Sequence, residues 1–82
     1  MERTITVSMD GELLTREAAK IAERMMRYRA RVLLSRENIT VNGKSLMGLV
    51  SVGLRDGVQV TILTEGEDAE QAARELARLL GA

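Results

Sequence analysis

The feature that most constrains this chain is a hydrophobic period that switches repeatedly between about 2 and about 3.6 residues. Residues 4–9 alternate, with Ile5 and Val7 on one face, which is typical of a half-buried strand. From Thr15 to about Tyr28 the apolar residues recur at helical spacing, which predicts a helix with Thr15 as its N-cap. Every block is short, so the fold must combine small strands with small helices.

The rest of the chain continues this alternation. In order, the predicted elements are a strand at 30–34, a strand at 39–41, a short helix at 46–53 capped by Ser45, a strand at 58–63 and a helix at 67–80. The polar link 36–38 predicts a hairpin between the first two of these strands. The order predicts an α+β fold, in which a four-stranded antiparallel sheet carries three helices on one face. We expect one domain, residues 1–82.

The other face of the sheet is expected to be open to water. The residues predicted to lie on it are Thr4, Thr6, Ser8, Thr40, Gln59 and Thr61, with Leu33 and Leu63 as apolar exceptions.

The chain contains neither cysteine nor histidine. Disulfides, thiol chemistry, zinc sites of the usual kind and imidazole catalysis are therefore excluded. Asp10, Glu12 and Glu17 form a loose group of carboxylates, which we interpret as solvated charges because nothing indicates that they are buried. We expect no enzyme activity, no metal and no cofactor; an enzyme would have to depend on these carboxylates.

Charge and composition limit the partners. Twelve basic residues balance twelve acidic ones, and Tyr28 is the only aromatic residue, so direct nucleic-acid binding is not expected. No apolar stretch is long enough to cross a bilayer, so no membrane association is expected. The first residues lack the apolar core of a secretory signal, and a cytoplasmic location is expected.

Two segments carry a resemblance to a known family. The runs GKSLMGLVSVGL at 43–54 and GVQVTI at 57–62, in this order of elements, resemble the histidine-containing phosphocarrier protein (HPr) of the sugar phosphotransferase system. The resemblance extends over almost the whole chain. It implies the family's open-faced β-sandwich, with the order βαββαβα.

The resemblance fails at the family's phosphoryl-accepting motif, a Gly-Leu-His-Ala-Arg-Pro-Ala type of run. The matching segment here is ELLTREA at 12–18, in which Leu14 stands in place of the histidine and is followed by Thr15. Arg16 matches the motif's arginine, and Glu17 replaces its proline. The chain is therefore similar to the catabolite-repression HPr-like paralogues, which lack the histidine, and we expect it to be unable to carry phosphohistidine.

Ser45 admits two interpretations that are compatible with each other. It is a predicted helix N-cap, and the resemblance implies that it is also a regulatory phosphorylation site. An HPr-type kinase or a transcriptional regulator is the protein partner that the resemblance implies.

The short predicted helix has more apolar residues than one side of it can bury. Either they all cover the core, or some bind a partner, as the family's docking surface implies. The predicted partner-binding residues are Leu46, Met47, Leu49, Val50, Arg16 and Arg24.

Two further hypotheses stay open. The chain could be a self-associating assembly module that uses a sheet edge or the Leu33 and Leu63 patch, or a drifted phosphocarrier. A monomer or a weak homodimer is expected.

Overall fold

The computed structural model describes residues 1–82. The elements follow one another in the predicted order. They are β1 (Glu2–Thr6), α1 (Thr15–Met25), β2 (Arg31–Arg36), β3 (Ile39–Asn42), α2 (Leu46–Ser51), β4 (Gln59–Glu65) and α3 (Ala69–Leu79).

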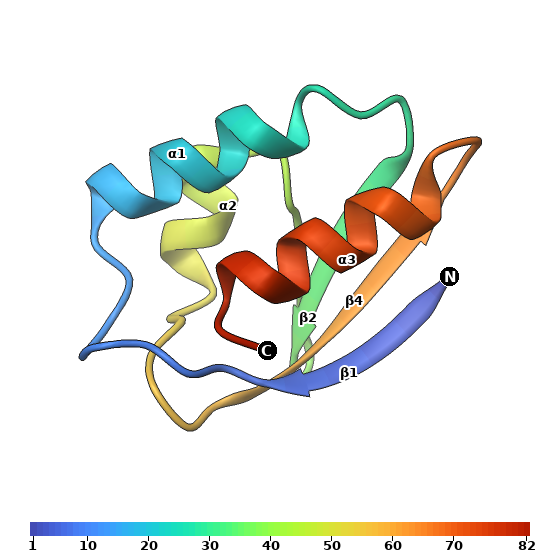
Figure 1. Ribbon diagram of the computed structural model, residues 1–82. Coiled ribbons are helices and arrows are strands. Elements are labelled where there is room, and N and C mark those ends of the chain that lie inside the picture. Colours follow the sequence, from blue (N-terminus) through green and yellow to red (C-terminus); the bar gives the residue numbers. More distant parts are fainter.

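The strands form one antiparallel sheet in the order β1-β4-β2-β3. β1 and β3 are its edges, and the three helices lie together on one face (Figure 1). This confirms the predicted α+β fold with its four-stranded antiparallel sheet and three helices. None of the helices is long and apolar enough to cross a membrane.

The core lies between the sheet and the helices. In β4, Val60, Ile62 and Thr64 are buried while the residues between them are at least partly exposed. Since neighbouring side chains of a strand point to opposite faces, only one face of the sheet is covered. Helices α1 and α3 bury the apolar stripes on which their prediction rested, including Met25 and Leu76.

Several boundaries differ from the prediction. β1 ends at Thr6, although alternation continues to residue 9. Beyond β1 the backbone of Val7 still bonds Gly57 and Val58, which precede β4. The N-cap of α1 is Leu14, and Thr15 is the first helical residue, so the prediction that Thr15 caps the helix is wrong. α1 ends at Met25, three residues before Tyr28.

The open face carries a row of hydroxyl groups that crosses all four strands. The hydroxyls of Thr4 and Thr61 lie 3.1 Å apart, and those of Ser35 and Thr40 lie 2.8 Å apart. The register places Thr61 opposite Ser35 and so joins the two pairs into one row. This face is polar but uncharged along the row, in agreement with the prediction for its threonines.

Candidate docking surface at the start of the first helix

The segment that leads into α1 is held by backbone hydrogen bonds. The Leu13 N–H donates to the Leu54 carbonyl at 2.8 Å, and Glu12 forms a β-bridge with Arg55. Leu14 follows in extended conformation and leaves 60% of its surface exposed. Leu14 therefore presents an outward-facing aliphatic side chain at the N-terminus of α1.

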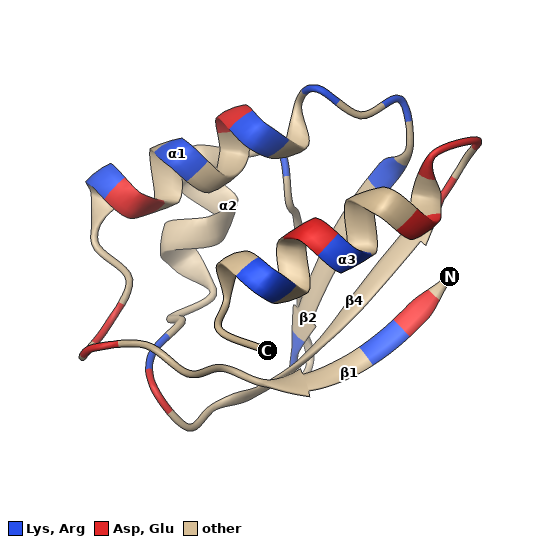
Figure 2. Ribbon diagram, in the orientation of Figure 1, with Lys and Arg blue, Asp and Glu red and all other residues tan.

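The first turn of α1 is exposed and charged, and Figure 2 shows a basic and an acidic position next to each other there. Thr15, Arg16 and Glu17 are all exposed, and Glu17 places a carboxylate near the positive end of the helix dipole. Arg16 has no carboxylate within 4.0 Å, so it does not pair with Glu12 or Glu17. An anion approaching this helix end would meet one arginine and one carboxylate.

Ser45 is the N-cap of α2, as predicted. Its Oγ accepts a hydrogen bond from the Gly48 N–H at 3.0 Å. The neighbouring cation does not face it: Lys44 Nζ donates to the Tyr28 carbonyl at 2.7 Å, just beyond the end of α1. A phosphate on Ser45 would therefore depend on the α2 N–H groups unless Lys44 gives up this bond.

The apolar residues of α2 divide between core and surface. Met47 is 73% exposed, Val50 is 40% exposed, and Leu46 is partly buried against the core. Leu49 is fully buried. It belongs to the core and cannot be a contact residue, so the expectation that it binds a partner is corrected.

Arg24 is occupied within the fold. It forms an ion pair with Glu75 of α3, which also pairs with Arg78 at 3.4 Å and accepts a hydrogen bond from the Tyr28 hydroxyl at 2.5 Å. The Glu75 side chain is only 12% exposed. The hydrogen bond to Glu75 and burial raise the pKa of Tyr28 above its ordinary value of 10.0. The ion pair of Arg24 with Glu75 therefore connects α1 to α3.

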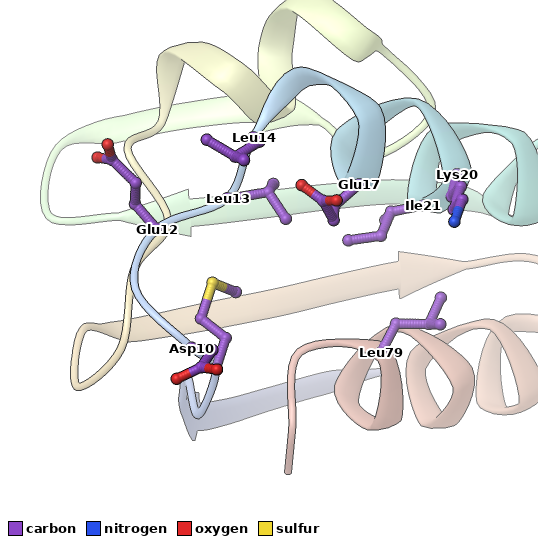
Figure 3. Close-up of a pocket in the computed structure, with 9 residues that line it drawn as sticks. Asp10, Glu12, Leu13, Leu14, Glu17, Lys20, Ile21 and Leu79 are labelled. Carbon is purple, nitrogen blue, oxygen red and sulfur yellow. The ribbon is translucent and has the colours of Figure 1, made fainter.

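A surface hollow of about 450 Å³ lies between the start of α1 and the end of α3 (Figure 3). The residues that line it are Met9, Asp10, Glu12, Leu13, Leu14, Glu17, Lys20, Ile21 and Leu79. Asp10, Glu12 and Glu17 were predicted to be a loose group of solvated carboxylates without a shared pocket, whereas the structure places all three on this hollow. The signal in the sequence that could have indicated this hollow was the apolar pair Leu13 and Leu14 before the helix. No group of three or more acidic residues is arranged to hold a metal ion.

Comparison with known proteins shows similarity to the HPr family over most of the chain. The profile described as the PTS HPr component phosphorylation site matches residues 1–82. The HPr-like protein Crh of Bacillus subtilis (strain 168) is 32% identical over 77 residues, which are 94% of this chain and 91% of that protein.

Two solved structures are similar to this fold. The phosphocarrier protein HPr from Bacillus anthracis has a TM-score of 0.92 at 35% identity, covering 98% of this chain and 95% of that one. A domain-swapped dimer of Bacillus subtilis catabolite repression containing protein Crh has a TM-score of 0.77 at 33% identity, covering 93% of this chain and 87% of that one. Because the profile spans the whole chain and the relatives cover most of it, the chain belongs to the HPr family.

Proposed function

We propose that this HPr-family protein is a non-catalytic regulatory protein that binds a protein partner and cannot carry phosphohistidine. The observation that carries the proposal is the absence of any histidine from the chain. Where the family places its phosphoryl acceptor, Leu14 offers only an exposed aliphatic side chain. The similarity to a Bacillus subtilis protein described as the catabolite repression containing protein Crh supports a regulatory role.

The start of α1 also disfavours a bound phosphoryl group. Helix N-termini attract anions through their free N–H groups and the helix dipole. Here Glu17 supplies an anion to that position from the chain itself. Replacing the acceptor alone would therefore not restore a phosphoryl site of full strength.

The proposed docking surface consists of Leu14, Arg16, Leu46, Met47 and Val50. These side chains come from the start of α1 and the outer side of α2, two helices that pack against each other. An apolar centre beside an arginine is typical of protein interfaces. Leu49 and Arg24 are left out because they are engaged in the fold.

Ser45 is the proposed regulatory site, with an HPr-type serine kinase acting on it. Its hydroxyl lies at the start of α2, two residues before the exposed Met47. A phosphate there would add negative charge at the edge of the docking surface and so change which partner, such as a transcriptional regulator, can bind.

The test is intact-mass analysis after incubation with ATP and a serine kinase of the HPr regulatory system. We expect one added phosphate on the wild-type chain and none on Ser45→Ala. Ser51→Ala is the matched control and should still be phosphorylated. If the kinase modifies an authentic HPr but not this chain, regulation at Ser45 is ruled out.

A test of the docking surface is separate from the phosphorylation test. Met47→Ser and Val50→Ser change exposed side chains only, so the fold should persist. We expect both to weaken binding of a partner recovered with the wild-type protein, as measured by calorimetry. Unchanged affinity in both variants would place the interface elsewhere.

Self-association is a second candidate function. Leu33 of β2 lies directly opposite Leu63 of β4 on the open face, and both are half-buried. Solved relatives include dimers of Crh and of HPr. Light scattering after size-exclusion chromatography tests this function: a dimer that Leu33→Ser abolishes would support it, and a strict monomer at high concentration would exclude it.

A further inference from the structure

We propose that the hollow between the start of α1 and the end of α3 binds a segment of a partner protein in which a basic side chain stands next to an aliphatic one. The hollow borders the proposed docking surface at Leu14 but faces α3 rather than α2. The proposal therefore goes beyond the surface near Ser45 and does not depend on phosphorylation.

The lining of the hollow is largely aliphatic. Leu13 and Ile21 come from the α1 side and Leu79 from the last turn of α3, and Figure 3 shows their side chains facing the same space. The volume of about 450 Å³ lies within the range of about 300–1,000 Å³ that is usual for ligand sites. The hollow is thus large enough to take one or two side chains of a partner.

The rim of the hollow is acidic. Asp10, Glu12 and Glu17 contribute three carboxylates, and Lys20 contributes the only ammonium group of the lining. None of the four has an opposite charge within 4.0 Å. Most of the negative charge around an aliphatic floor is therefore uncompensated within the molecule.

Two carboxylates of α3, in contrast, form ion pairs within the molecule. Glu70 pairs with Arg74, and Glu75 pairs with Arg24 and Arg78. The rim carboxylates are thus available to an incoming cation, whereas these are not. A segment with arginine or lysine beside leucine or a similar residue complements both the charge and the aliphatic lining.

The rim is held in place before any ligand arrives. The Met9 N–H donates to Asp56 Oδ1 at 3.1 Å, and the Asp56 N–H donates to the Gly11 carbonyl at 3.0 Å. The Leu13 N–H bond to Leu54 fixes the other end of the same loop. Because the loop is already ordered, little conformational entropy is lost on binding.

The experiment is an NMR titration of the full chain with three capped peptides of equal length. One alternates leucine with arginine, one alternates leucine with glutamate, and one alternates leucine with glutamine. We expect saturable shifts of the Leu13, Glu17, Ile21 and Leu79 amides with the arginine peptide, and at least fivefold weaker binding of the other two. Raising the salt concentration should weaken the arginine complex.

Matched variants test whether the carboxylates of the hollow contribute to binding more than carboxylates elsewhere on α1. Glu17→Gln removes a rim carboxylate, and we expect it to weaken the arginine peptide about two- to fivefold, the range of an exposed ion pair. Glu23→Gln removes the same charge from the same helix but outside the hollow, and should leave the affinity unchanged. Leu14→Ser tests the aliphatic part, and its side chain is exposed enough for the fold to persist.

Three results would overturn the proposal. The first is equal binding of the glutamate and arginine peptides, and the second is the absence of saturable shifts at the lining residues. The third is the same set of shifts on concentrating the protein alone, which would assign the hollow to a second copy of this chain. Failure of phosphorylation at Ser45 would leave the proposal unaffected.

Discussion

Ser45 holds the start of α2 through a single side-chain oxygen. A six-residue helix has few internal hydrogen bonds, so its N-cap carries a large share of its stability. The same oxygen would carry the proposed phosphate. The Ser45 Oγ is therefore both the atom that caps α2 and the atom that would be phosphorylated.

We expect Ser45→Ala to lower the free energy of unfolding by about 1 kcal/mol, because the Gly48 N–H loses its partner. Ser45→Asp should retain most of the stability, since aspartate caps helices as well as serine does. Urea unfolding measures both. Ser51→Ala, an exposed change at the other end of α2, should cost less than Ser45→Ala; an equal or larger cost would contradict the role of the cap.

Asp68 gives the chain a local sensitivity to acid. Its carboxylate accepts the Arg29 N–H at 2.9 Å and the Ala30 N–H at 2.8 Å. The Arg29 hydrogen bond, followed by that of Ala30, lowers the pKa of Asp68 below its ordinary value of 3.8. A lowered pKa in the folded state stabilises the fold above pH about 3.8, and this contribution disappears as the pH falls through the folded-state value.

Asp68→Asn should therefore be less stable than wild type at pH 7, and the difference should shrink as the pH falls below about 3.8. Urea unfolding at a series of pH values checks this. Glu67→Gln removes an adjacent exposed carboxylate that makes no hydrogen bond, and should leave the acid dependence unchanged. If Asp68→Asn and wild type differ equally at all pH values, titration of Asp68 does not contribute.

Sequence reasoning at the residue scale succeeded where the partner is close along the chain. The Ser45 cap reaches only three residues ahead, and its residue type and spacing predict it. Thr15 has the residue type of a cap, but the loop reaches the helix with Leu14 as the last extended residue. That register follows from the Leu13 bond to Leu54, a contact that periodicity does not reveal.

At the scale of elements, α1 and α3 are joined by the cluster around Glu75. Tyr28, Arg24 and Arg78 all converge on this one carboxylate. Helical periodicity predicted both apolar stripes correctly. It could not predict which polar residues meet across the helices, because Tyr28 and Glu75 lie 47 positions apart.

The tyrosine provides a spectroscopic test of this cluster. Tyr28 is the only aromatic residue, so phenolate absorbance during an alkaline titration reports this side chain alone. The wild-type midpoint should lie above pH 10.0, because the hydrogen bond to Glu75 favours the protonated phenol. Glu75→Gln should lower the midpoint towards 10.0, whereas Glu70→Gln, on the exposed side of α3, should leave it in place.

A raised tyrosine pKa also predicts a dependence of stability on alkaline pH. The stabilisation is complete below pH about 10.0 and is lost as the pH rises through the folded-state value. Tyr28→Phe should lower the free energy of unfolding by about 1.5–3 kcal/mol at neutral pH, the range for a hydrogen bond to a charged group. The variant should also lose less stability than wild type in alkali; an identical alkaline loss would contradict this assignment.

At the scale of the whole molecule, the order of elements was enough to predict the sheet and the helix layer. Strands of period two and helices of period 3.6 in this order leave few arrangements that bury every apolar face. The hollow was not predictable in the same way. It brings Leu79 beside residues 9–21, and that proximity exists only after α3 has docked on the sheet.

Leu80, just beyond α3, contributes to closing the core. Leu80 is fully buried, and its carbonyl accepts the Ser8 N–H at 2.9 Å just beyond β1. Removing residues 80–82 should lower the free energy of unfolding by about 3 kcal/mol or more, since it deletes a core leucine and this hydrogen bond. Removing Ala82 alone should cost less than about 1 kcal/mol, as measured by urea unfolding. Equal stabilities of the two truncated chains would show that Leu80 does not close the core.

The row of hydroxyls on the open face offers a position for attaching the protein to a surface or a probe. No cysteine occurs anywhere in the chain, so Thr40→Cys would create a unique thiol on the open face of the sheet. A tether or fluorophore placed there would leave the α1 and α2 side chains facing outward. The protein could then be immobilised in one defined orientation, with its proposed interaction surfaces free for measurement.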